Sequence, residues 1–167
     1  MREPAFAIWV TGARAGAVEA MADEIVRRLA LRHVPIEVLD ARTPYIEACP
    51  GTDGAVFVAQ LLVRHGVAVV IGVEAPIRAA RERARAVLGR MIEVYVRPIG
   101  EAVLAGYEPP TRPEVEIGLP EPAPGSGAER VLHTLEVLGL LARDAQAAYS
   151  EDEEREVIRR LKAFGYL

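Results

Sequence analysis

A short glycine-containing loop near the amino terminus is the first place in this sequence where chemistry could occur. It lies between an apolar run and a segment of helical periodicity, and it holds Gly12, Ala13, Arg14, Ala15, Gly16 and Ala17. Strand, glycine loop and helix is the arrangement in which backbone N–H groups and a helix dipole bind phosphate. The order predicts a phosphate- or nucleotide-binding loop in which the N–H groups of the last three residues point outward.

The side chains that complete such a loop are missing. The motif G-x-x-x-x-G-K-[S/T] needs a lysine that reaches the β- and γ-phosphates and a hydroxyl that holds Mg²⁺. Val18 stands at the lysine position and Glu19 at the hydroxyl position, and Ala17 replaces the second glycine. The sole lysine of the chain, Lys162, lies near the carboxyl terminus. The loop is therefore a degenerate motif, and an ordinary strand-to-helix turn is an equal alternative.

A second group of candidates is expected at the carboxyl ends of the strands, where parallel α/β sheets bind their ligands. Arg42, Arg78 and Arg81 could converge there on an anion, and Asp40 could hold a metal or a hydroxyl group. The alternatives are solvated helix charge for the arginines and a turn cap for the aspartate.

The other reactive residue types give weaker signals. Glu19 and Glu74 could form a carboxylate pair, although their separation in sequence does not show whether they face each other. The three histidines lack metal-ligand spacing, so no metal site is predicted. Cys49 is the single cysteine and is interpreted as an inert thiol in a reducing compartment.

Composition favours one globular domain with a sizeable core. The chain has 167 residues, of which 51% are hydrophobic, and a net charge of -4. This charge argues against a nucleic-acid groove. The apolar stretches are too short to span a bilayer, and no signal peptide is recognised, so a cytoplasmic protein is expected.

Strand and helix patterns alternate along the chain, which predicts a parallel, doubly wound sheet of four or five strands. The first strand should be central, because its apolar run does not alternate with polar residues. Strands are expected at 5–10, 36–39, 67–73, 92–96 and 115–117, and helices at 17–32, 55–65, 77–88 and 128–143, with one helical turn at 100–104 and a linker at 119–127.

Several stretches, in matching order and spacing, resemble the adenylyl-sulfate (APS) kinase family. AIWVTG, IEVLD and MIEVYV resemble its first, second and fourth strands, and VAQLLVRHGVAVVIG resembles its helix and third strand. APIRAARERARAVLG resembles the segment that begins S-P-Y-R-A, and YEPPTRPEVEI the Y-E-P-P-x-x-P-E stretch. The resemblance implies a P-loop kinase-like fold with helices on both faces of the sheet. We expect residues 1–143 to form this domain and residues 144–167 a C-terminal helical tail.

The departures from the family pattern concern its chemistry. The family loop resembles G-L-S-G-A-G-K-S-T, whereas residues 12–20 lack the lysine and both hydroxyls. The family's L-D-G-D-x-x-R becomes Leu39–Arg42, with Arg42 in place of the acid thought to act on the APS hydroxyl. Its N-I-R-R falls on residues 51–54, which contain no arginine. Only ten residues separate Val96 from Tyr107, so most of the family's mobile lid is missing.

Three interpretations follow. The first is a catalytically inactive APS-kinase-like domain, a pseudokinase with no catalytic residue. It would have a regulatory, nucleotide- or anion-sensing or partner-binding role linked to sulfate activation. It would bind ATP, ADP, sulfate or phosphate weakly at best. The second is a divergent but active APS kinase or other nucleotide kinase that uses Arg14 in place of the lysine. The third is an interaction module without a ligand.

The tail has its own helix signals. Ser150 and Glu153 form a capping box. The apolar side of the helix consists of Val157, Ile158, Leu161 and Phe164. A helix of this length is marginal alone in water, so this side needs a cover. Either the tail folds back on its own sheet and closes the region left open by the missing lid, or it docks on a second copy or a partner protein.

Overall fold

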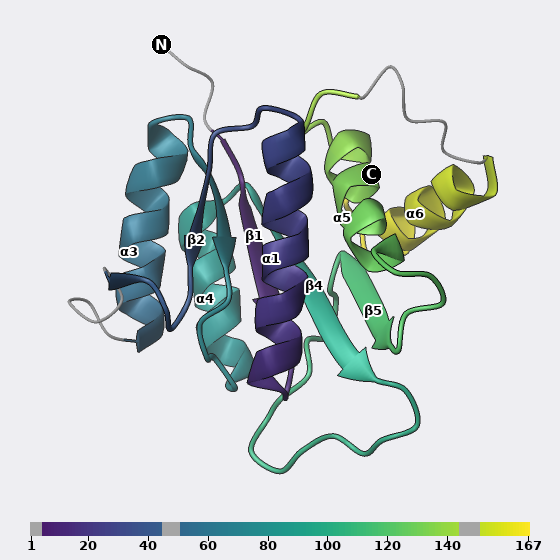
Figure 1. Cartoon of the computed structure of the whole chain (residues 1–167), viewed down its shortest axis with the longest axis horizontal. Coiled ribbons are helices and arrows are strands. Elements are labelled where there is room, and N and C mark those ends of the chain that lie inside the picture. Colours follow the sequence, from purple (N-terminus) through teal and green to yellow (C-terminus); the bar gives the residue numbers. More distant parts are fainter. Residues whose placement is uncertain (1–4, 45–50, 144–150) are drawn as a thin grey trace.

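A computed structural model describes residues 5–44, 51–143 and 151–167, and its core is a five-stranded parallel sheet (Figure 1). The strand order is β2-β3-β1-β4-β5, so the prediction of a central first strand is confirmed. The strands are β1 (Ala7–Thr11), β2 (Ile36–Leu39), β3 (Ala68–Ile71), β4 (Met91–Pro98) and β5 (Val115–Leu119).

Helices cover both faces of the sheet, as the doubly wound fold requires. One face is covered by α1 (Ala15–Leu31) and α5 (Ser126–Val137), and the other by α3 (Gly51–Arg64) and α4 (Arg78–Leu88). Successive residues of β1 point to opposite faces, so Ile8 packs in the core beneath α1 and α5 while Trp9 packs in the core beneath α3 and α4. Every residue of β1 is buried, which explains its unbroken apolar run.

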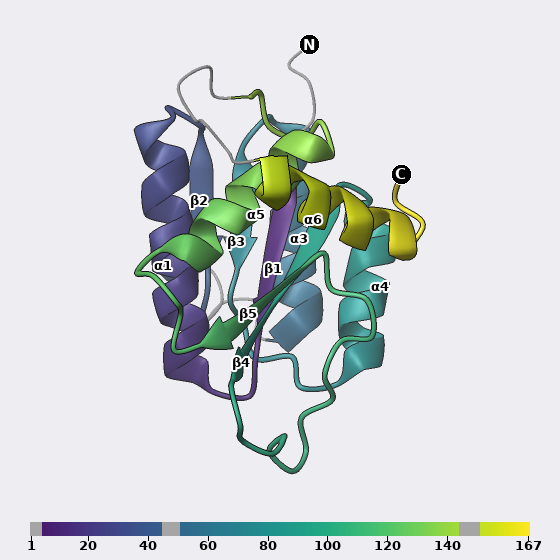
Figure 2. The same cartoon turned by 90° about the vertical axis from the view of Figure 1, so that its right-hand side faces the viewer.

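The tail forms helix α6 (Glu151–Ala163), which packs on its own chain. It lies across the side of the molecule next to α5 and the start of β5 (Figure 2). Leu161 is fully buried, and the Arg160 guanidinium donates to the carbonyl oxygen of Pro113 at 3.3 Å. This contact lies at the amino end of β5, so the expectation that the tail closes the lid region is wrong. Ser150 of the predicted capping box lies outside the described residues.

Two predicted elements differ in the structure. Residues 100–104 form no helical turn; they belong to a loop in which Gly100 and Gly106 have left-handed φ angles of 78° and 84°. The helix predicted to reach residue 143 ends at Val137, and Gly139 follows with φ 68°, a conformation that ends a helix.

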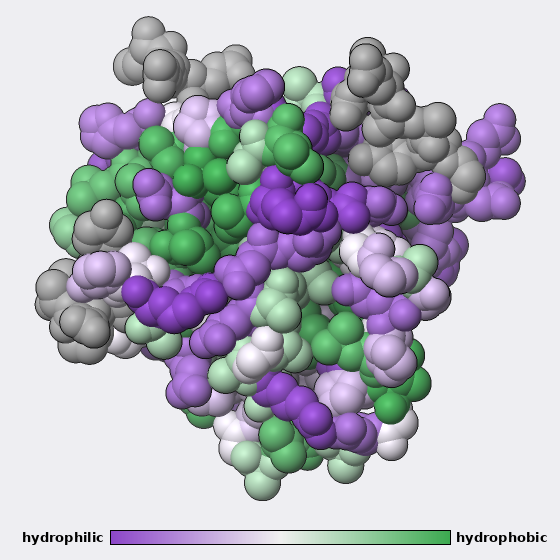
Figure 3. Space-filling view, viewed as in Figure 1, coloured by the Kyte–Doolittle hydropathy of each residue, from purple (hydrophilic) through white to green (hydrophobic). Residues whose placement is uncertain are grey.

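An apolar area lies over α3 and β2 on the face seen in Figure 3. On α3, Phe57 and Leu61 are 59% and 43% exposed. Within the part of the chain that the structure describes, no helix is long and apolar enough to cross a lipid bilayer.

Candidate functional site

The loop between β1 and α1 is shorter than a phosphate-binding loop. Helix α1 begins at Ala15, so only Gly12, Ala13 and Arg14 connect it to β1. The N–H groups of Ala17 and Val18 both donate to the carbonyl oxygen of Arg14 at 3.1 Å. The expectation that the Ala17 N–H points outward is therefore wrong, and of the three predicted donors only Ala15 and Gly16 lie at the helix start without an intrahelical acceptor.

Gly12 is needed for packing. A Cβ atom at this position would lie 2.5 Å from the carbonyl oxygen of Val96 and 3.2 Å from a methyl group of Val18. Real Cβ atoms do not approach a carbonyl oxygen so closely, so the loop can lie against the end of β4 only with glycine here. The first glycine of the motif thus has a structural role that needs no phosphate.

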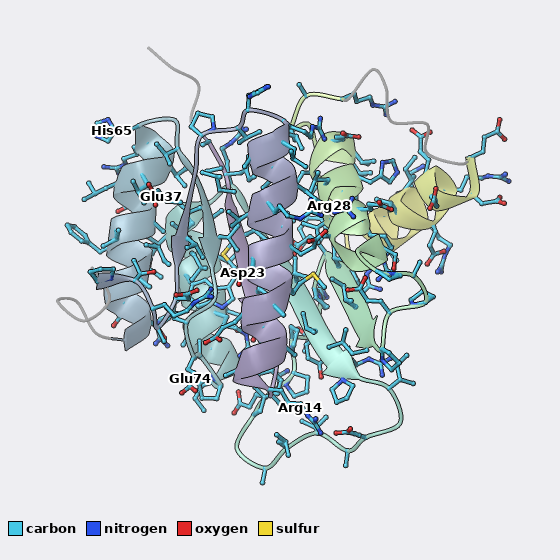
Figure 4. All side chains as sticks on the ribbon, viewed as in Figure 1. Arg14, Asp23, Arg28, Glu37, His65 and Glu74 are labelled. Atoms are coloured by element: carbon cyan, nitrogen blue, oxygen red, sulfur yellow. The ribbon has the colours of Figure 1, made fainter. Side chains whose placement is uncertain are left out.

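A hollow of about 300 Å³ opens at the carboxyl ends of β1 and β3, where ligands bind in parallel α/β sheets. Its charged lining residues are both acidic, Glu19 and Glu74, and none of the described residues that line it is lysine or arginine. Figure 4 places Glu74 and Arg14 on opposite sides of the start of α1. Besides these carboxylates, the lining consists of Val10, Thr11, Gly12, Ala13, Ala15, Val18, Ala41, Gly72, Val73, Ala75, Pro76 and residues 104–107.

Two arginines near the strand ends, Arg14 and Arg42, are paired with carboxylates of the protein. Arg14 forms an ion pair with Glu101, which lies in the loop after β4, and both side chains are about half exposed, 55% and 49%. Arg42 binds Asp23 on α1 at 2.8 Å and also binds Asp40. These pairs neutralise the positive charge that a bound anion would need.

Arg81 is buried and faces the protein interior. Its Nε donates to Glu93 Oε1 at 2.8 Å, and its other nitrogens donate to the carbonyl oxygens of Ala75 and Glu108, each at 2.5 Å. The structure therefore does not bring Arg42, Arg78 and Arg81 together on an anion: the first and last are used in internal contacts. Arg78 starts α4, where its backbone N–H donates to Glu108.

Asp40 caps the turn that follows β2. Its carboxylate accepts hydrogen bonds from the backbone N–H of Arg42 at 2.8 Å and from Arg42 Nε at 2.9 Å, and it lies 3.5 Å from Thr43 Oγ1. Burial alone would raise the pKa of Asp40, but the hydrogen bonds from Arg42 outweigh it and hold this pKa below its ordinary value. This geometry matches the turn-cap alternative.

Two hydroxyl groups that the sequence motifs do not predict face the hollow. Thr11 Oγ1 lies 2.9 Å from Tyr107 Oη, and the ring of Tyr107 stacks on Tyr95 at a centroid distance of 6.1 Å. Burial raises the pKa of Tyr107 to about 12, so this hydroxyl keeps its proton at neutral pH. The sequence signal was the position of Tyr107 at the start of the Y-E-P-P stretch.

A buried ionic network fixes the wall that carries Tyr107. Arg85 binds Glu114 at 2.5 Å, and Glu114 Oε2 accepts the backbone N–H of Glu93 at 2.6 Å. Together with Arg81, which holds the carbonyl of Glu108, these contacts attach residues 108–114 to α4 and β4. The Y-E-P-P-x-x-P-E stretch therefore has a structural anchor.

The described residues contain no group of three His, Cys, Asp or Glu side chains that could hold a metal ion. Cys49 lies outside the described residues. The polar groups that line the hollow are two carboxylates, two hydroxyls and backbone groups.

Comparison with known proteins finds adenylyl-sulfate kinases that match most of this chain. No family model matches the chain. The adenylyl-sulfate kinase of Gloeothece citriformis is 26% identical over 84% of this chain and 99% of its own length. The probable adenylyl-sulfate kinase of Pyrococcus abyssi is 26% identical over 81% of this chain and 98% of its own length.

Solved structures share the fold. A hexameric APS kinase from Thiobacillus denitrificans matches 85% of this chain and 31% of its own, with a TM-score of 0.68 and 19% identity. The APS kinase of Mycobacterium tuberculosis in complex with AMPPNP and APS matches 85% of this chain and 100% of its own, with a TM-score of 0.63 and 19% identity. Over most of its length this chain is similar in sequence to adenylyl-sulfate kinases, at 26% identity, and it shares their fold.

Proposed function

We propose that this chain is a catalytically inactive APS-kinase-like domain, a pseudokinase with a regulatory or partner-binding role linked to sulfate activation. The observation that carries the proposal is the charge of the hollow beside the β1–α1 loop. Two carboxylates and no cationic side chain line it, where a kinase needs cations around the phosphates. Names of the relatives supply the link to sulfate activation.

Phosphoryl transfer depends on positioning and on charge neutralisation. Removing one electrostatic partner typically lowers a rate by about 10²–10³-fold. Arg14 is the one cation in the loop, and Glu101 already neutralises it. The active-kinase alternative, in which Arg14 replaces the lysine, is therefore not better supported than the inactive domain. For the same reason ATP, ADP, sulfate and phosphate are expected to bind weakly at best.

The partner-binding part of the proposal rests on a different surface. Phe57 and Leu61 expose large apolar side chains side by side on α3, one helical turn apart. Contiguous exposed apolar surface is typical of protein interaction sites. This observation also favours the interaction-module alternative.

We expect no adenylyl-sulfate kinase turnover. The test is a coupled assay with ATP, Mg²⁺ and APS, in which the enzyme from Gloeothece citriformis serves as the active control. A rate in the range of about 1–100 s⁻¹ that is typical of kinases would overturn the proposal.

Restoring the loop chemistry should improve ATP binding without restoring catalysis. The variant Ala17→Gly, Val18→Lys, Glu19→Ser removes a carboxylate from the hollow and adds an ammonium group to it. A charge-assisted hydrogen bond contributes about 1.5–3 kcal/mol, so ATP should bind about tenfold or more tightly. Calorimetry measures the affinity, with Glu82→Ser on the exposed side of α4 as the control. An unchanged ATP affinity in a variant that remains folded would show that the loop shape, and not its side chains, prevents binding.

A further inference from the structure

Helix α3 exposes a stripe in which two apolar side chains lie between two opposite charges. Phe57 is 59% exposed and Leu61 is 43% exposed, and the exposed residues Asp53 and Arg64 lie beyond them toward the two ends of the helix. At about 100° per residue, the four side chains fall within an arc of about 80°, so they share one side of the helix. We call these four residues the α3 stripe.

The two charges of the α3 stripe are not matched within the described chain. Neither the Asp53 carboxylate nor the Arg64 guanidinium forms an ion pair or a side-chain hydrogen bond with any described residue. On α1, by contrast, two arginines of the exposed side, Arg27 and Arg28, both bind Glu24. The α3 stripe therefore combines exposed apolar surface with an acidic end and a basic end that have no partner of their own.

The order acidic, apolar, apolar, basic is self-complementary when two copies of the helix run antiparallel. With Phe57 opposite the partner's Leu61, each Asp53 lies within one residue of the level of the partner's Arg64, an offset of about 1.5 Å along the axis. Antiparallel packing also opposes the two helix dipoles, which is favourable. A parallel pair would instead place like charges opposite each other, so the charges select the antiparallel pair.

We propose that the α3 stripe is the interface of a twofold-symmetric homodimer in which two α3 helices pack antiparallel. Phe57 and Leu61 form its apolar centre, and each Asp53 pairs with the partner's Arg64 at the rim. This inference rests on the partner-binding role proposed above and names a second copy of the chain as the partner. One face of a 14-residue helix is smaller than the about 800 Å² per partner that a stable interface buries, so the dimer is weak.

Sedimentation equilibrium of the full chain tests for the dimer. We expect a dissociation constant of about 0.1 mM, so the chain is mainly monomeric at about 10 µM and mainly dimeric at about 1 mM. Phe57→Ser and Leu61→Ser should each weaken the dimer by about tenfold or more, because each substitution acts twice in a symmetric pair. A chain that stays monomeric at about 1 mM, or a dimer unaffected by both serine variants, would overturn the proposal.

The matched control for these variants is Leu31→Ser. Leu31 is 69% exposed at the end of α1, on the other face of the sheet, so its loss should leave the dimer unchanged. Thermal melting of all three variants at low concentration shows that they remain folded. Equal weakening by Leu31→Ser would mean that the association is not specific to the α3 stripe and would overturn the proposal.

Charge reversal tests the antiparallel arrangement. Asp53→Lys and Arg64→Glu should each weaken the homodimer by about threefold to tenfold at low salt, because each dimer then contains two like-charged pairs. An equal mixture of the two variants should associate like the parent chain, since both rim pairs of the mixed dimer again join opposite charges. No recovery on mixing would overturn the antiparallel pairing.

This test is separate from that of the proposed function. Kinase turnover with ATP and APS would overturn the pseudokinase, whatever the oligomeric state. A chain without turnover that also stays monomeric at about 1 mM would overturn only the homodimer.

Discussion

Replacing Arg81 by alanine is expected to destabilise the protein by about 3–5 kcal/mol, the cost of breaking a buried ion pair by removing one partner. The Arg81 side chain is 1% exposed, and it binds Glu93 and two backbone carbonyls. Its loss would leave two carbonyl oxygens without their donor, and the buried Glu93 carboxylate would keep only the longer ion pair with Arg85, at 3.5 Å. Urea unfolding of the purified chain measures this loss of stability.

The control is Arg83→Ala, on the same helix but exposed to solvent, which should change stability by less than about 0.5 kcal/mol. The double variant Arg81→Met, Glu93→Leu removes both charges and should recover part of the loss, because an apolar pair leaves no unpaired buried charge. If Arg81→Ala costs less than about 1 kcal/mol, the network does not hold residues 108–114 as described.

Leu161→Ala is expected to cost about 2–5 kcal/mol, the range for truncating a buried leucine. Leu161 is fully buried, with 0% of its surface accessible to solvent, whereas most residues of α6 are exposed. Thermal melting compares it with Lys162→Ala, its exposed neighbour, which should melt like the parent chain.

Deleting residues 151–167 tests how the tail acts. Because α6 packs on its own chain, we expect a monomer before and after deletion, with a lower melting temperature after it. A dimer that becomes a monomer on deletion would instead support docking of the tail on a second copy. An unchanged melting temperature in both the deletion and Leu161→Ala would contradict the observed packing.

The sequence predicted the order of the elements well because burial on both faces leaves a visible pattern. The apolar run of β1 indicated a central strand, and β1 lies between β3 and β4. The ends of the elements were less predictable. Helix α5 ends at Val137, and Gly139 behind it adopts a left-handed conformation. The sequence-based prediction continued the helix to residue 143 because the apolar pattern continues beyond this glycine.

The candidate site was predictable only where residue types were decisive. The absence of a lysine in the loop can be seen directly, but the pairing of Arg14 with Glu101 joins residues 87 positions apart and leaves no local signal. The burial of Arg81 does have a local sequence signal. Arg81 precedes Ala84 and Leu88 by three and seven residues, so all three share the buried side of α4. An arginine on such a stripe indicates an internal anchor more than a ligand.

The contact of Gly12 with the end of β4 also makes the β1–α1 loop preorganised. Gly12 packs closely against the backbone of Val96 at one end of the loop, and the first hydrogen bonds of α1 hold the other end. A ligand that enters beside this loop does not have to order it, so little of its binding energy is lost as conformational entropy. The rim of the hollow is therefore rigid before a ligand binds, and the affinity for a ligand depends on the side chains at this rim.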